Sequence, residues 1–255
     1  MLYRTFIIIV LCLSAVTQSM AGWYECYNFE GKVGDYPITL YIQRVDGYYG
    51  DADKKHFNLA GVYKYNHINT PIVLEGVLDT VSGKVALYEQ DEDGSISAFT
   101  FSLVEGGMVE GGWISTDDNA HKQLTLQFVS MLRDKVDSDD YEDIPILQQA
   151  ALTNFYFVGK YSKKAGKNSA VMTSLDIIRK SDNKVFQTLD FSNIETATGN
   201  VSTIIFQNID VPIKQQNSFL IWNGIGRIGG YLNVHFDRKR NRFVMNTTPV
   251  IDGPQ

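Results

Sequence analysis

The chain has few cysteines, histidines and prolines. Only two of its 255 residues are cysteines, and Cys12 lies in an N-terminal segment that we expect to be removed. The remaining Cys26 then has no partner for an intramolecular disulfide. We expect Cys26 to be a small buried apolar residue beside Trp23, Tyr24 and Tyr27, and a thiol paired with another molecule is the alternative.

The scarcity of histidine argues against a zinc site and against histidine-based catalysis. The four histidines lie far apart and include no pair at the short spacings that zinc sites use. The chain also lacks the Gly-x-Ser-x-Gly motif of serine hydrolases. Cys26 has no basic neighbour that would activate it as a nucleophile. We therefore expect no catalytic residue, no resident metal and no cofactor.

Basic residues are also few, and they form no dense cluster. The chain has 23 basic and 29 acidic side chains, for a net charge of −6. Because nothing basic is gathered to neutralise phosphates, we do not expect nucleic acid or a nucleotide as a partner. A negatively charged surface favours a basic protein partner, or it simply keeps the chain soluble.

Only one apolar run is long enough to suggest targeting, and it lies at the N-terminus. Arg4 precedes the apolar residues 6–13, and Ser19-Met20-Ala21 places small residues at the two positions that a signal peptidase reads. The pattern predicts a signal peptide over residues 1–21, cleaved after Ala21. The run is too short for a permanent membrane span, so we expect a periplasmic or secreted protein that is not an integral membrane protein.

Most of the remaining chain alternates apolar and polar residues with a period of two, which is typical of half-buried strands. Turn-forming pairs such as Asp46-Gly47 and Ser82-Gly83 separate these segments. The sequence therefore predicts an all-β fold of antiparallel meander sheets. The expected strands include residues 38–42, 62–65, 72–76, 85–89, 98–103, 124–128, 175–178, 185–189, 201–206, 219–222, 231–236 and 242–245.

An acidic run divides the chain. Residues 134–145 contain six carboxylates and a single lysine, which indicates a solvated linker or an exposed loop. We expect an N-terminal β module over residues 22–133, this acidic linker or loop, and a C-terminal β module over residues 146–255. The two modules could pack as one domain, and residues 146–154 could form one short helix.

A glycine-rich segment at residues 224–229 matches Gly-x-Gly-x-x-Gly, but its context does not fit a dinucleotide site. That motif needs a helix after it, whereas the residues that follow continue as a strand. We interpret the segment as a hairpin tip that carries Arg227 between Trp222 and Tyr231. Arginine and aromatic residues on a rigid scaffold suit protein recognition, so these three are the predicted binding residues. An inert turn is the alternative.

Carboxylates near the predicted strands of the first half allow a second hypothesis. Glycosidases need a pair of carboxylates facing each other across the substrate, and Glu75, Glu89, Glu105 and Glu110 are the candidates. Strand alternation normally places such residues on the solvated face. A glycosidase-like enzyme or a carbohydrate-binding module is thus the alternative to a protein-binding function.

The mature chain resembles exported bacterial proteins of the lysozyme-inhibitor and immunity type, which have a β-propeller-like C-terminal half. The shared motifs specify strands and turns more than activity. They are Gly61-x-Tyr63-x-Tyr65, Ile72-x-Leu74-x-Gly76, Val85-x-Leu87-x-Glu89, Gly112-Trp113, Leu175-x-Ile177, residues 184–189, and Phe236-Asp237-Arg238-Lys239 before Phe243.

The resemblance implies a calcium loop before the closing strands, and here that loop is degenerate. Asn208 and Asp210 remain, while the other oxygen ligands and the glycine are missing. Because calcium takes six or more oxygen ligands, we expect no bound cofactor, and calcium at this remnant is the alternative.

The resemblance also implies a function. Members of this family insert a loop into the active-site cleft of a peptidoglycan-cleaving enzyme. We therefore expect a non-enzymatic exported protein whose partner is a protein, namely a cell-wall hydrolase or a toxin, and whose effect is steric occlusion.

Overall fold

The structure is a computed structural model. It describes residues 25–45, 56–89, 97–104, 106–115, 120–133, 140–164, 170–194, 204–212, 217–225 and 228–248. The predicted signal peptide, residues 134–139 of the acidic run and Arg227 lie outside these residues. The described chain confirms the predicted all-β class: it consists of antiparallel strands and one 3₁₀ turn, η1 (Ile205–Gln207). In this part of the chain, no helix has the length and hydropathy needed to cross a membrane.

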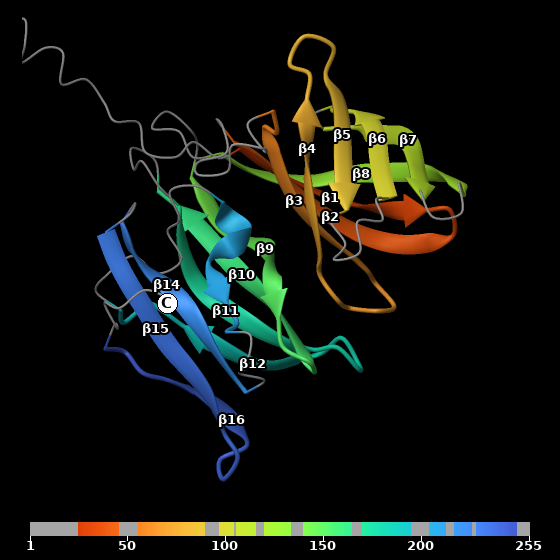
Figure 1. Ribbon diagram of the computed structural model, residues 1–255. Coiled ribbons are helices and arrows are strands. Elements are labelled where there is room, and N and C mark those ends of the chain that lie inside the picture. Colours follow the sequence, from red (N-terminus) through yellow and green to blue (C-terminus); the bar gives the residue numbers. More distant parts are fainter. Residues whose placement is uncertain are drawn as a thin grey trace, which may run out of the picture.

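The first eight strands form a closed antiparallel barrel (Figure 1). Each strand pairs with the next one along the chain, and β1 also pairs with β8, which closes the cylinder. The strands are β1 (Glu25–Val33), β2 (Tyr36–Arg44), β3 (Leu59–Tyr65), β4 (Ile72–Leu78), β5 (Lys84–Glu89), β6 (Ser97–Ser102), β7 (Met108–Ser115) and β8 (His121–Arg133). Period-two alternation in the sequence indicates these strands but not the closure, which joins residues about a hundred positions apart.

The barrel interior is filled by side chains. Alternate residues of each strand point inward and form one apolar cluster, as expected for an eight-stranded barrel. Phe29, Leu40, Leu74 and Phe99 have no exposed surface. The barrel therefore has a solid core, and its polar groups lie at the two open ends and on the outer wall.

The second half forms two four-stranded antiparallel sheets, in the orders β12-β11-β10-β9 and β13-β14-β15-β16. Aromatic side chains join the sheets face to face: the rings of Phe157 and Phe219 are 4.5 Å apart, and those of Phe155 and Phe243 are 5.4 Å apart. The strands are β9 (Tyr141–Ala151), β10 (Phe155–Lys163), β11 (Val171–Arg179), β12 (Val185–Asp190), β13 (Ile209–Asp210), β14 (Ser218–Ile225), β15 (Ile228–Asp237) and β16 (Arg242–Met245).

Three expectations for this half need correction. The resemblance implied a propeller-like arrangement, which sets several blades around a central channel; the described strands instead form a two-layer sandwich. The short helix expected at residues 146–154 is absent, because residues 146–151 belong to β9 and pair with β10. The acidic linker was expected to extend to Pro145, but β9 already begins at Tyr141. Pairing with β10 outweighs local helix propensity and local charge at these positions.

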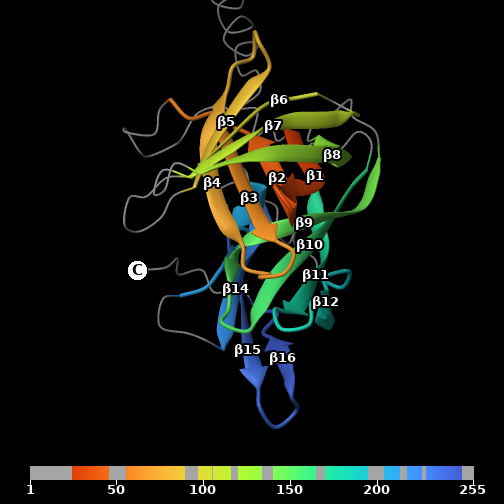
Figure 2. The same ribbon diagram turned by 90° about the vertical axis from the view of Figure 1, so that its right-hand side faces the viewer.

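The outer wall of the barrel packs directly on the sandwich, and we call this contact the seam. Cys26, Tyr41, Ala60 and Val62, which face outward from β1, β2 and β3, belong to the same buried cluster as the sandwich core. Figure 2 shows the barrel strands above and the sandwich strands below, with β9 and β10 next to the barrel. The outer wall of the barrel is therefore part of the sandwich core, while the barrel interior forms a separate cluster.

Buried polar groups fix the geometry of the seam. Among the described residues, hydrogen bonds between side chains and backbone cross it. The Ile205 N–H donates to Gln43 Oε1 (2.7 Å), Asn69 Nδ2 donates to Lys180 O (3.0 Å), Gln149 Nε2 donates to Gly61 O (3.3 Å) and Asn28 Nδ2 donates to Pro145 O (3.4 Å). Lys64 is also buried here, with its ammonium 5.3 Å from the centre of the Tyr156 ring. Buried amides are costly unless bonded, so these pairs select one orientation of barrel and sandwich.

Adjacent glycines in β7 provide a test of how tightly the barrel wall is packed. A Cβ on Gly111 would lie 2.3 Å from Thr100 O and 2.7 Å from Phe101 Cβ, whereas one on Gly112 would meet only Thr100 Oγ1, at 3.6 Å. We predict that Gly111→Ala lowers the free energy of unfolding by about 1–3 kcal/mol, because β6 must move away. Gly112→Ala should leave it unchanged or raise it by up to about 1 kcal/mol. Urea denaturation measures both, and equal effects would contradict the described packing.

Candidate functional site

Two of the three predicted binding residues lie together on the sandwich. Trp222 in β14 pairs directly with Tyr231 in β15, and their rings meet edge to face with centroids 5.2 Å apart. Both side chains are half-buried, on the face opposite the buried Ile221 and Leu232. Arg227 lies outside the described residues. The structure thus forms an aromatic pair on the outer face of this sheet, which we call the Trp222–Tyr231 pair.

The two residues of the degenerate calcium loop point to different places. Asn208 is fully buried, and its Nδ2 donates to Tyr161 Oη at 2.6 Å and to Ile205 O at 3.1 Å. Asp210 is half-buried and pairs with Leu220 on β14. Burial and the Asp210 carboxylate raise the pKa of Tyr231. Asn208 therefore forms hydrogen bonds in the protein interior, while Asp210 adds negative charge beside the Trp222–Tyr231 pair.

The other candidate site is one open end of the barrel, which the sequence did not predict as a site. At this end the inward-facing positions change from apolar to polar and aromatic. Glu89 follows the inward Leu87 by two residues, and Lys122 precedes the inward Leu124 by two. We define the aromatic mouth as the residues gathered there: Tyr36, Tyr65, Glu89, Trp113 and Lys122.

Two hydrogen-bond donors from the barrel interior hold the Glu89 carboxylate. Its Oε1 accepts hydrogen bonds from the Tyr63 hydroxyl, at 2.5 Å, and from the Trp113 indole N–H, at 3.2 Å. Burial and the Glu89 carboxylate raise the pKa of Tyr63 far above its ordinary value. A folded pKa above the unfolded value of about 10 means that this stabilising effect is present below pH 10 and is lost as the pH rises above it.

Lys122 lies between two rings of the aromatic mouth. Its ammonium is 5.0 Å from the centre of the Tyr36 ring and 5.0 Å from the centre of the Trp113 ring. Tyr36 is 48% exposed, and its ring also contacts Tyr65 and His67 with centroids 6.2 and 5.6 Å away. Cation–π contacts of this kind hold the lysine in place while its charge stays at the surface.

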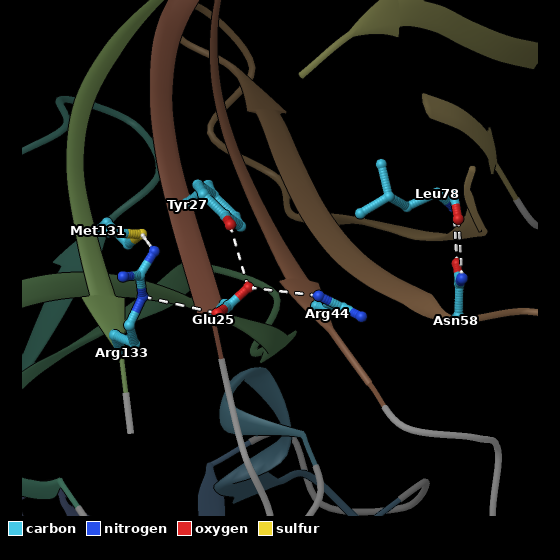
Figure 3. Close-up of polar contacts among 7 residues, drawn as sticks. All are labelled: Glu25, Tyr27, Arg44, Asn58, Leu78, Met131 and Arg133. Atoms are coloured by element: carbon cyan, nitrogen blue, oxygen red, sulfur yellow. Dashed lines mark hydrogen bonds and ion pairs between the residues drawn. The ribbon is translucent and has the colours of Figure 1, made fainter. Parts of the chain in front are cut away.

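The opposite end of the barrel has its charges compensated (Figure 3). There Glu25 lies between Arg44 and Arg133, with nitrogen–oxygen distances of 3.8 and 3.6 Å, and it accepts a hydrogen bond from the Tyr27 hydroxyl at 3.2 Å. Arg133 also contacts the Met131 sulfur at 3.5 Å. In contrast, neither Glu89 nor Lys122 forms an ion pair with another residue that the structure describes. The aromatic mouth is thus the end that keeps its charges available.

The carboxylates considered for glycoside hydrolysis do not form a facing pair. Glu75 pairs across the strands with Tyr88, the residue before Glu89, so Glu75 and Glu89 lie on opposite faces of the barrel wall. Glu110 is exposed on β7, where it alternates with inward residues. Glu105 lies outside the described residues. The arrangement therefore does not give Glu75, Glu89 and Glu110 the geometry of an acid–base pair.

Cys26 is fully buried in the seam. Its thiol contacts Asn28 Oδ1 at 3.6 Å, and burial raises the pKa of the thiol strongly. A buried thiol with a raised pKa is a poor nucleophile. The structure thus confirms the expectation of a small buried apolar residue. In the described part of the chain, no group of three or more histidine, cysteine, aspartate or glutamate side chains could hold a metal ion.

The chain matches no protein-family model, no curated protein and no solved structure. The candidate sites are therefore defined by geometry alone. The sequence predicts the Trp222–Tyr231 pair, because the two residues flank one hairpin, but it does not indicate Tyr36 or Lys122 as site residues. The available signal was the polar or aromatic residue that ends an otherwise apolar inward series, as Glu89 does in β5.

The hydrogen bond from Tyr63 to Glu89 yields a prediction for stability. Tyr63→Phe leaves the carboxylate with one donor, so the free energy of unfolding should fall by about 1–3 kcal/mol at neutral pH. Tyr88→Phe, on the outer face of the neighbouring β5, serves as the control and should change it by less than about 0.5 kcal/mol. Urea denaturation followed by far-UV circular dichroism gives both values. A loss no larger in Tyr63→Phe than in the control would show that the bond does not stabilise the barrel.

Proposed function

We propose that this protein is an exported, non-catalytic binding protein that inhibits a peptidoglycan-cleaving enzyme of the lysozyme type by covering its sugar-binding groove. The observation that carries the proposal is the Trp222–Tyr231 pair, which presents two large aromatic side chains on a packed sheet. Tryptophan, tyrosine and arginine dominate binding energy at protein interfaces. The two aromatic side chains bury much surface at little entropic cost, because each has only two side-chain torsions. Arg227, which follows the end of β14 by two residues in the sequence, would add a charged anchor.

The rigidity of the scaffold supports a steric mechanism. The inner face of the same sheet packs on the other sheet through Phe219, Ile221 and Leu232, all of them fully buried. A contact surface whose backbone is already fixed loses little conformational entropy on binding. Such a surface suits occlusion of a preformed groove better than a surface that must fold on contact.

Charge supports the class of partner. The chain carries a net charge of −6, and Asp210 lies beside the aromatic pair. An acidic inhibitor is attracted to a basic enzyme over long range, which speeds association and makes it sensitive to salt. The sequence resemblance to lysozyme inhibitors points to the same partner class.

A panel of purified muramidases tests the proposal. The signal-cleaved protein should slow the lysis of a cell-wall suspension by at least one of them, more strongly at low salt. The double variant Trp222→Ala/Tyr231→Ala should need at least about tenfold more protein for the same inhibition, which corresponds to a loss of roughly 1.4 kcal/mol.

The matched control is Tyr88→Ala, which removes a half-buried ring from the outer wall of the barrel and should inhibit like the wild type. Circular dichroism establishes that each variant is folded. If no enzyme of the panel is inhibited, or if the double variant inhibits as well as the wild type, the proposal is wrong.

A further inference from the structure

We propose that the aromatic mouth of the barrel is a second binding site, and that its ligand is a neutral saccharide built of pyranose rings. The mouth lies on the barrel, whereas the Trp222–Tyr231 pair lies on the sandwich. The inference therefore stands independently of the proposed inhibition. It rests on three features of the mouth: a fixed carboxylate, a fixed ammonium group and exposed aromatic surface.

The carboxylate is preorganised to accept hydrogen bonds. The Tyr63 hydroxyl and the Trp113 indole N–H both bind Oε1 of Glu89, and Tyr63 and Trp113 are themselves buried at 1% and 9% exposure. Because these two buried side chains fix Oε1, the second oxygen of the Glu89 carboxylate has a defined direction. It has no hydrogen bond to any residue that the structure describes. An acceptor oriented in this way fits a ligand hydroxyl group.

The ammonium of Lys122 is fixed in the same manner, but by aromatic faces. It is 5.0 Å from the ring centres of both Tyr36 and Trp113. Trp113 thus contacts both charged groups, through its N–H edge on Glu89 and through its face on Lys122. The indole separates the two charges, so each one can bind a ligand without first breaking an ion pair within the mouth.

Exposed aromatic surface completes the mouth. Tyr36 is 48% exposed and Tyr65 is half-buried. The exposed His67 borders the mouth, and its ring contacts both tyrosine rings, which also contact each other. An aromatic ring offers an apolar surface to the C–H face of a pyranose, while its neighbours bind the hydroxyl groups around the edge. Beside these rings, Lys122 supplies a hydrogen-bond donor and Glu89 supplies an acceptor.

The two opposite charges decide the ligand class. An anion would be attracted to Lys122 and repelled by Glu89, and a cation would experience the reverse. A neutral polyhydroxylated ring can donate to the carboxylate and accept from the ammonium at once, with no net electrostatic penalty. A zwitterion such as a dipeptide also matches both charges, but it would leave the exposed rings without an apolar partner, so we favour the saccharide.

Binding of three soluble hexasaccharides tests this inference: the β-1,4-linked hexamers of N-acetylglucosamine, glucose and mannose. The full signal-cleaved protein is titrated by calorimetry, and the indole N–H resonance of Trp113 is followed by NMR. At least one hexamer should bind and shift the Trp113 signal. Tyr36→Ala and Glu89→Gln should each weaken its binding at least tenfold, whereas Tyr36→Phe should retain it.

Tyr88→Ala serves as the control, with the same loss of a tyrosine ring on the outer wall, and it should bind like the wild type. Because Glu89→Gln could perturb the barrel, Lys122→Met provides a second surface variant, and it should also weaken binding. Binding of none of the hexamers, or binding that the mouth variants leave unchanged, would overturn the inference. Glycylglycine that shifts the Trp113 signal when no hexamer does would also overturn it, in favour of a zwitterionic ligand. Inhibition of muramidases by the Trp222–Tyr231 pair is measured separately, so either proposal can fail alone.

Discussion

The seam between the barrel and the sandwich is the contact on which the rest of the structure depends. The outer wall of β1, β2 and β3 contributes Cys26, Tyr41 and Val62 to the core of the sandwich, so each half covers apolar surface that the other would leave exposed. Buried amides then fix the orientation. Loss of the Gln43 side chain would leave the Ile205 N–H unsatisfied, at a cost of about 1–3 kcal/mol.

A rigid joint gives the two candidate sites a defined relation to each other. The aromatic side chains of the aromatic mouth and of the Trp222–Tyr231 pair are carried by packed strands. A molecule with two fixed contact surfaces can hold a partner in one orientation, whereas a flexible joint would present the surfaces at variable angles. The proposed steric inhibition needs only one of these surfaces, the Trp222–Tyr231 pair on the packed sandwich sheet.

Residues 205 and 206, which were expected in a strand, belong to η1, and no strand was expected at β1, β9 or β10. The sequence predicted most of the other strands, because period-two alternation follows directly from burial of one face of a sheet. It did not reveal which strands meet over long distances. Closure of β1 on β8 and packing of Cys26 against the sandwich join residues far apart in the chain, and no local pattern encodes them. The same reason explains both the strand at residues 146–151, where a short helix was expected, and the aromatic mouth, which combines residues from β2, β3, β5, β7 and β8. Trp222 and Tyr231 were predictable because a single hairpin brings them together.

Differential scanning calorimetry of the signal-cleaved protein tests the central claim, that the barrel and the sandwich form one cooperative unit through the seam. We expect a single transition whose van't Hoff enthalpy equals the calorimetric enthalpy for the whole chain. Two separate transitions, or a calorimetric enthalpy about twice the van't Hoff value, would contradict it, because the two halves would then unfold independently.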